Sequence, residues 1–201
     1  MAANSAAPDR ILLILDLDET LVHACEHPLD RPADFRLFDY HVYRRPGLDE
    51  FLAACTASFD LAVWSSASDD YVAGVVEAVF PNADHLSFVW GRSRATWRRH
   101  LNPDDVYLHS PHDHRHYLKP LRKLRRLRWR LERMLIVDDT PEKCVRNYGN
   151  AIYVRPYEGD PEDNELSLLA AYLQSLKDCP NVRTVEKRRW RDEALRLSST
   201  A

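Results

Sequence analysis

The sequence predicts an α/β fold, a single Rossmann-like domain with a central parallel sheet, and two observations carry this prediction. Segments such as "ILLILDL" (11–17) and "RMLIVDD" (133–139) contain short unbroken apolar runs, which are typical of strands buried on both faces of a parallel sheet. Segments of helical periodicity alternate with these strands, the order expected of βαβ units. A chain of 201 residues is long enough for one such domain.

The remaining elements follow from the same patterns. Residues 35–47 alternate weakly and predict an extended hairpin or flap, and residues 46–55 follow as a helix with one apolar face. Further strands are expected at 59–68, 86–90 and 150–157, and further helices at 68–80, 119–127 and 161–177. The predicted organisation is a flexible leader at 1–9, a main domain at 10–180 with an insertion or long loop at about 91–118, and a C-terminal surface helix within 181–201 that docks through Trp190.

Composition excludes several classes of protein. The formal net charge of −3 gives no general attraction to nucleic acid or to an anionic membrane. The first residues lack the features of a signal peptide, and no apolar run approaches the roughly 20 residues that span a bilayer. The four cysteines are widely spaced and are expected to be reduced thiols. We therefore expect a cytoplasmic protein, or a nuclear one in a eukaryote, with no membrane partner; no feature predicts an oligomeric state.

Polar residues follow three of the predicted strands at the point where each strand ends. Asp16 and Asp18 follow the first, Ser66 the second, and Asp138 and Asp139 the fourth. Because the carboxyl ends of parallel strands meet at one edge of the sheet, these side chains are expected to converge there. Several carboxylates so close together repel one another unless a cation lies between them. A hard, oxygen-seeking ion such as Mg²⁺ fits such a cluster.

The spacing of Asp16 and Asp18 allows the two carboxylates to have different catalytic roles. In different environments, one can stay ionised while the other carries a proton. In a phosphoryl transfer, Asp16 would attack phosphorus, and Asp18 would protonate the leaving oxygen and later activate water. Lys119 would balance the charge of the transferring group, and the Ser66 hydroxyl would hold one of its oxygens.

These residues, in this order, resemble the haloacid dehalogenase superfamily of phosphotransferases. The four elements of that pattern stand here as "DLDET", "WSSAS", "YLKPL" and "VDDTPEK". The segment "RRPGLDEFL" extends the resemblance to the small C-terminal-domain phosphatase or NLI-interacting-factor-like branch. The resemblance covers roughly residues 10–180 and is weakest between 91 and 117. It implies a minimal cap and Mg²⁺-dependent hydrolysis of phosphomonoesters through an aspartyl-phosphate.

The resemblance also implies a role for each site residue. The catalytic residues would be Asp16, Asp18 and Lys119. The substrate phosphate would be bound by Ser66, Lys119 and Thr20, and Thr20 would also orient the loop. The metal site would consist of Asp16, the backbone carbonyl of Asp18, and both Asp138 and Asp139. Asp139 stands where closer relatives have Asn, so which member of that pair contacts the ion stays open.

The substrate and two unusual segments leave alternatives open. A small cap favours phosphoserine or phosphothreonine on a protein; a small-metabolite phosphatase or a non-catalytic scaffold module are the alternatives. The histidines of "HSPHDHRHY" could bind a transition metal, border the active site, or lie in a solvated loop; they are His109, His112, His114 and His116. The run "KPLRKLRRLRWRLERM" is strongly basic and could bind nucleic acid or an acidic partner, or recruit the substrate. Its leucines recur at helical spacing, which favours a solvated basic face.

Overall fold

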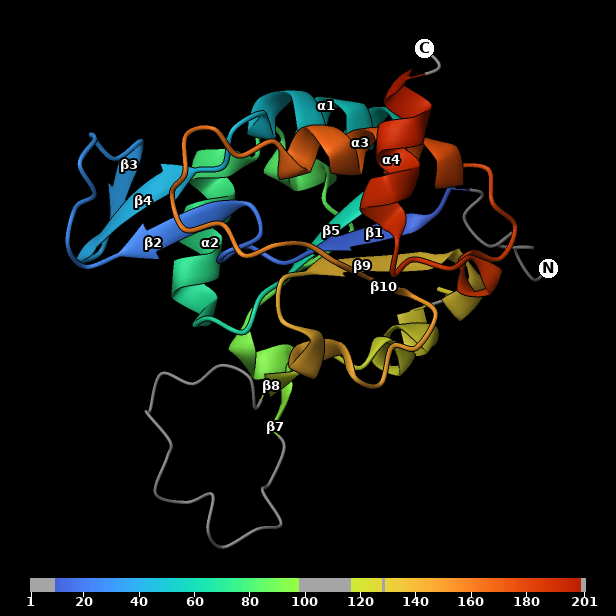
Figure 1. The fold of residues 1–201 in the computed structure, drawn as a ribbon. Coiled ribbons are helices and arrows are strands. Elements are labelled where there is room, and N and C mark those ends of the chain that lie inside the picture. Colours follow the sequence, from blue (N-terminus) through green and yellow to red (C-terminus); the bar gives the residue numbers. More distant parts are fainter. Residues whose placement is uncertain (1–9, 98–116, 128, 200–201) are drawn as a thin grey trace, which may run out of the picture.

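A five-stranded parallel sheet forms the centre of the protein (Figure 1), in a computed structural model that describes residues 10–97, 117–127 and 129–199. Its strands are β1 (Leu12–Leu15), β5 (Asp60–Trp64), β6 (Val89–Trp90), β9 (Met134–Asp138) and β10 (Ala151–Tyr153), in the order β10-β9-β1-β5-β6. β1 pairs in parallel with β5 on one side and with β9 on the other. The predicted α/β fold with a central parallel sheet is confirmed.

The apolar run of β1 serves both faces of the sheet, because alternate residues of a strand point in opposite directions. Leu13 and Leu15 join the larger hydrophobic cluster, whereas Leu12 and Ile14 join the smaller one. The larger cluster also receives buried residues from four helices: α1 (Leu48–Ser58), α2 (Asp69–Val79), α3 (Glu165–Leu176) and α4 (Trp190–Ser199). Figure 1 shows α1, α3 and α4 together above the sheet.

Short 3-10 helices cover the other face. They include η5 (Leu121–Leu127), η6 (Leu131–Arg133) and η7 (Pro141–Cys144). The α-helix expected from residue 119 to 127 is therefore wrong in type, although Leu121 and Leu124 are buried as its pattern required. A 3-10 helix eclipses residues three apart, and the leucines at 121, 124 and 127 have that spacing. Leu127 is 50% exposed, so the buried row ends before it.

A small antiparallel sheet follows the loop after β1. It consists of β2 (Val22–Cys25), β3 (Phe35–Leu37) and β4 (Tyr40–Arg44) in the order β2-β4-β3. The expected hairpin is present as β3 and β4, and β2 adds a strand that the sequence pattern did not indicate. This three-stranded cap sheet agrees with a minimal cap.

The region expected as an insertion is described only at its two ends. η2 (Arg92–Arg94) and β7 (Thr96–Trp97) lie at one end, and β8 (Tyr117–Leu118) pairs antiparallel with β7 from the other. The four histidines at 109–116 lie outside the described residues, so their expected roles remain untested.

The C-terminal segment packs into the main core. The Trp190 side chain is 2% exposed and its Nε1 donates a hydrogen bond to the Tyr153 carbonyl at 2.8 Å. The helix α4 packs on α3. Two further short 3-10 helices, η1 (Ala83–His85) and η8 (Val182–Thr184), precede α4 in the chain. All four cysteines have free thiols. Among the described residues, no helix has the length and apolar character needed to cross a membrane.

Candidate active site

A tight loop after β1 separates the two aspartates of "DLDET". The Asp16 N–H still donates to the Val137 carbonyl of β9, at 3.0 Å, so Asp16 continues the pairing between these strands. The Leu17 carbonyl then accepts the N–H groups of residues 20, 21 and 22, which coils the chain. Glu19 takes a left-handed conformation with φ of 55°. The coil therefore sends Asp18 into surroundings different from those of Asp16.

Asp16 is fully enclosed and surrounded by hydrogen-bond donors. Its Oδ2 lies 2.8 Å from Lys119 Nζ and 3.1 Å from Lys143 Nζ. Its Oδ1 accepts the Leu17 N–H at 2.9 Å. Burial by itself raises the pKa of this carboxyl, but the two ammonium groups and the backbone donor outweigh it and lower the pKa to about 2. Asp16 is consequently held as a buried carboxylate at neutral pH.

Asp138 and Asp139 complete an acidic cluster with Asp16. One carboxylate oxygen from each of the three lies within 4.8 Å of the others, an arrangement able to hold a metal ion. Lys119 Nζ contacts Asp138 Oδ2 at 2.7 Å, and the Thr140 N–H contacts Asp138 Oδ1 at 2.9 Å. Burial and the nearby Asp16 raise the pKa of Asp138. Within the described residues, the buried Asp139 Oδ1 accepts no hydrogen bond.

Lys143 is a member of the site that the sequence analysis missed. Its side chain is 6% exposed, and its Nζ lies 3.1 Å from Asp16, 3.6 Å from Asp139 and 3.9 Å from Asp138. Burial opposes its charge, but these three carboxylates raise its pKa well above the ordinary value. Lys143 stands four residues after Asp139 in "VDDTPEK". That spacing was the available signal.

Asp18 faces hydroxyl groups instead of ammonium groups. Tyr71, in the first turn of α2, donates from its hydroxyl to Asp18 Oδ1 at 2.7 Å, and Ser65 Oγ donates to Oδ2 at 3.3 Å. Burial raises the pKa of Asp18 to about 6, against the opposing effect of the Tyr71 hydrogen bond. Asp18 can therefore carry a proton near neutral pH. Neither hydroxyl partner was among the expected site residues: Tyr71 reaches the loop from a helix, and Ser65 directly follows β5.

The expected phosphate-binding residues lie close to this loop. Ser66 is 3% exposed at the end of β5, and its carbonyl accepts a hydrogen bond from Arg92 Nε at 2.9 Å. Thr20 is fully buried, and its hydroxyl has no partner among the described residues. Lys119 is also fully buried, between Asp16 and Asp138. Contact of these three residues with a phosphate remains a prediction.

Arg45 ties the loop to the rest of the domain. Its guanidinium makes two 2.8 Å contacts with the Asp163 carboxylate, before the start of α3. The same group donates to the Thr20 carbonyl at 3.0 Å and to the Arg155 carbonyl at 2.9 Å. Arg45 belongs to the "RRPGLDEFL" segment, so this segment supports the loop that carries the two aspartates.

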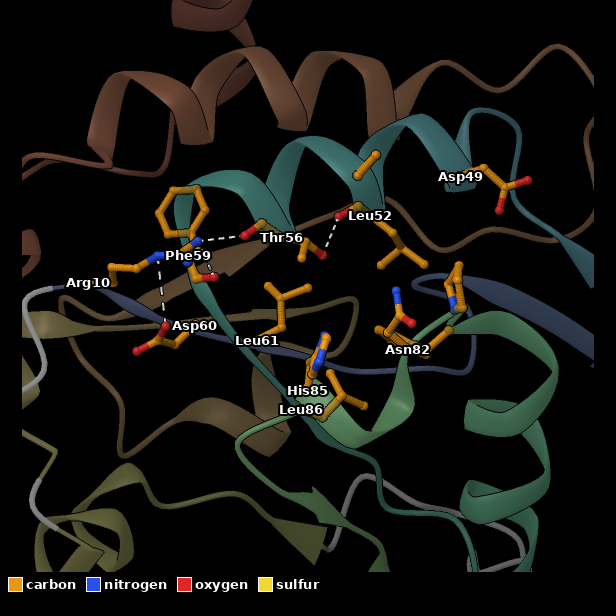
Figure 2. A pocket seen from close by; sticks show the side chains of 13 residues that line it. Arg10, Asp49, Leu52, Thr56, Phe59, Asp60, Leu61, Asn82, His85 and Leu86 are labelled. Atoms are coloured by element: carbon orange, nitrogen blue, oxygen red, sulfur yellow. Dashed lines mark hydrogen bonds and ion pairs between the residues drawn. The ribbon is translucent and has the colours of Figure 1, made fainter.

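A separate hollow at the other end of the sheet contains none of these residues. Figure 2 shows its lining near the amino ends of β1 and β5, where Arg10 points toward Phe59 and Asp60. Its volume is about 520 Å³, and Leu52, Leu61 and Leu86 contribute to its apolar wall. The clustered carboxylates and lysines lie instead at the carboxyl ends of the strands, where parallel sheets place their ligands.

Fold and site together define an α/β domain with a small cap sheet and a buried cluster of carboxylates and lysines at the carboxyl ends of its strands. The comparisons then give the family. The chain belongs to the NLI interacting factor-like phosphatases, whose family description matches residues 11–183.

Known relatives agree with this placement. The chain is 29% identical over 181 residues to "CTD small phosphatase-like protein 2" of Dictyostelium discoideum, covering 87% of this chain and 29% of that protein. It is 30% identical over 191 residues to human "Carboxy-terminal domain RNA polymerase II polypeptide A small phosphatase 1", covering 91% of this chain and 66% of that protein.

A solved structure shares the fold. Fission yeast RNA polymerase II CTD phosphatase Fcp1 superimposes with a TM-score of 0.54 and 17% identity, over 95% of this chain and 62% of that one.

Proposed function

We propose that this protein is a Mg²⁺-dependent phosphoserine/phosphothreonine protein phosphatase that works through an aspartyl-phosphate on Asp16. The observation that carries the proposal is the contrast between Asp16, with a pKa of about 2, and Asp18, with a pKa of about 6. Two carboxylates held apart in this way are suited to act as nucleophile and as acid/base.

In the first step, a carboxylate oxygen of Asp16 bonds to phosphorus as the bond from phosphorus to the leaving oxygen breaks. Asp18, protonated, gives its proton to that leaving oxygen. In the second step, the Asp18 carboxylate takes a proton from a water molecule, whose oxygen attacks the phosphorus. Phosphate leaves, and both Asp16 and Asp18 return to their starting states.

Lys119 and Ser66 would support the transferring group. Lys119 Nζ already lies between Asp16 and Asp138, so its positive charge faces the position where the phosphoryl group would attach. Ser66, at the end of β5, would offer its hydroxyl to a phosphoryl oxygen. Fixed donors of this kind stabilise charge that develops during phosphoryl transfer.

The acidic cluster fits a magnesium ion by its chemistry. Three carboxylates converge, and Asp139 Oδ1 is buried without a hydrogen bond in the described part of the chain. Oxygen ligands of this kind are those that Mg²⁺ prefers. Asp16, Asp138 and Asp139 would hold the ion, with the Asp18 backbone carbonyl as a further ligand. When bound, the ion would offset the negative charge of the phosphoryl group.

A protein substrate is favoured by the small size of the cap. The cap sheet spans only residues 22–44, which leaves little chain to close over a small metabolite. Relatives are named as phosphatases of the RNA polymerase II carboxy-terminal domain and of the nuclear envelope. Those names support a phosphorylated protein as substrate and a location in or near the nucleus.

The first test measures phosphate release from p-nitrophenyl phosphate with Mg²⁺, beside Asp16→Asn. Asp84→Asn, an exposed position in η1, is the matched control. The proposal expects activity in the wild type and in Asp84→Asn, and none with a chelator or with Asp16→Asn. Inactivity of the wild type with every divalent metal would favour a scaffold module, and activity in Asp16→Asn would mean another nucleophile.

The second test concerns the substrate. Release of phosphate from phosphoserine peptides is compared with release from sugar and nucleotide monophosphates. A higher kcat/KM on the peptides is expected. A strong preference for one metabolite would replace the protein-phosphatase proposal by that of a small-metabolite phosphatase.

A further inference from the structure

A strongly basic groove begins beside the site. It has a volume of about 990 Å³ and is lined along one wall by η5 and along the other by the segment of η2 and β7. Five cationic side chains line it, and no carboxylate of the described residues does: Arg94, Arg122, Lys123, Arg125 and Arg126. This concentration of charge stands out in a chain whose formal net charge is −3.

Two residues of the groove lining are joined directly to residues of the site. Pro120, in its lining, directly follows Lys119. Trp90, also in the lining, accepts the Ser65 N–H on its carbonyl at 2.9 Å, and Ser65 in turn holds Asp18. The groove is therefore built on the segments that follow Lys119 and Ser65 in the chain and in the sheet.

Three arginines of the groove have no acidic partner in the described part of the chain. Within the described residues, Arg122, Arg125 and Arg126 form no ion pair, although all three are exposed. Lys123 Nζ donates to the Arg94 carbonyl at 2.7 Å, which links the two walls. Burial and the neighbouring Arg94 lower the pKa of Lys123, a sign of crowded positive charge. Binding of an anion would reduce the electrostatic repulsion between these neighbouring cations.

The 3-10 geometry of η5 arranges these charges in rows. Residues three apart eclipse one another in such a helix, with a rise of about 2 Å per residue, so the backbone positions in a row are about 6 Å apart. Arg122 and Arg125 form one row, and Lys123 and Arg126 form the other. Side chains on one face of an extended peptide repeat every second residue, about 6.6 Å apart. The spacing along a row of η5 is therefore similar to the spacing of side chains on one face of an extended peptide.

We infer that this basic groove is a docking site for an extended acidic peptide segment, in which carboxylate or phosphate groups on alternate residues flank the phosphoresidue that reacts at Asp16. The inference rests on the proposed function and deepens it, because it names the substrate feature that the protein selects. The Trp90 ring beneath Arg94, 5.5 Å from its guanidinium carbon, and the exposed Leu127 offer apolar contacts that suit a peptide.

The test uses the full chain with three arginines replaced, R122Q/R125Q/R126Q. The matched control removes three exposed arginines from the C-terminal segment, R183Q/R188Q/R189Q. Two phosphoserine peptides differ only in their flanks, with glutamate or with glutamine at alternate positions. The wild type and the control are expected to have a kcat/KM at least about tenfold higher on the glutamate peptide, a preference that weakens with salt. The groove variant is expected to lose the preference and to keep its rate on p-nitrophenyl phosphate.

A binding measurement separates this inference from the proposed function. Fluorescence anisotropy follows a labelled glutamate peptide whose reacting serine is replaced by alanine, so no catalysis is involved. Weaker binding by the groove variant alone supports the groove, even if the wild type hydrolyses nothing. Equal binding by all three proteins overturns the inference. So does tighter binding of a single-stranded RNA of equal charge, which would make the groove a nucleic-acid surface.

Discussion

Asp16 and Asp18 are separated by one residue, yet they occupy opposite electrostatic surroundings. Asp16 contacts two lysines and the backbone, and its pKa is lowered to about 2. Asp18 contacts two hydroxyl groups and no lysine within ion-pair distance in the described structure, and its pKa is raised to about 6. The difference arises from the coil at Leu17 and Glu19, which turns the second carboxylate away from the lysines. One short motif thus places two carboxyl groups in the different environments that our proposed roles for them require.

After Asp16→Asn, which is expected to abolish turnover, the largest expected effect comes from Asp18→Asn. An amide cannot donate or accept the proton, so steady-state turnover should fall by about 10²–10⁴-fold, the usual contribution of general acid–base catalysis. The loss should be greater on a phosphoserine peptide than on p-nitrophenyl phosphate, because the serine alkoxide needs protonation more than nitrophenolate does. Equal losses on both substrates, measured by phosphate release, would contradict the role of Asp18 as acid.

The substitution Lys143→Met tests how a lysine beside Asp16 affects metal binding. The Lys143 ammonium and a metal ion would compete for the carboxylate oxygens of Asp16, Asp138 and Asp139. Without Lys143, Mg²⁺ should bind about tenfold more tightly, equivalent to about 1.4 kcal/mol. Thermal unfolding should show a lower Tm than wild type without Mg²⁺ and a larger rise on adding it.

Lys177→Met, which removes one exposed lysine at the end of α3, controls for the change of charge. It should show wild-type Mg²⁺ affinity by calorimetry. Mg²⁺ affinity that falls in Lys143→Met would show that Lys143 assists the metal site instead of competing for its ligands.

Tyr71→Phe is expected to produce the smallest change. The Tyr71 hydroxyl stabilises the charged form of Asp18, so its removal raises the pKa of Asp18. Asp18 must be protonated to act as acid, and the fall of kcat/KM at high pH should therefore move to higher pH. A hydrogen bond to a charge is worth about 1.5 kcal/mol, and partial exposure of Asp18 limits the shift to about one pH unit. A shift to lower pH would contradict the assignment.

The sequence predicted the parts of the site that follow directly from strand ends. Asp16 and Asp138 come after apolar runs, and the parallel sheet brings such ends together. Tyr71 and Lys143 were missed because their side chains reach the site from a helix and from a short 3-10 turn, and apolar periodicity does not indicate such directions. The type of helix at residues 121–127 was wrong because three leucines at a spacing of three fit both kinds of helix. β2 is four residues long and too short for alternation to show.

The central claim, that Asp16 is the nucleophile, is tested most directly by trapping the covalent intermediate. Asp18→Asn should slow the attack of water, so that phosphate from p-nitrophenyl phosphate accumulates on the protein after acid quenching. Peptide mass spectrometry is expected to place that phosphate on Asp16, and Asp16→Asn is expected to carry none. Phosphate on another residue, or rapid release with no covalent adduct at any time, would contradict the account.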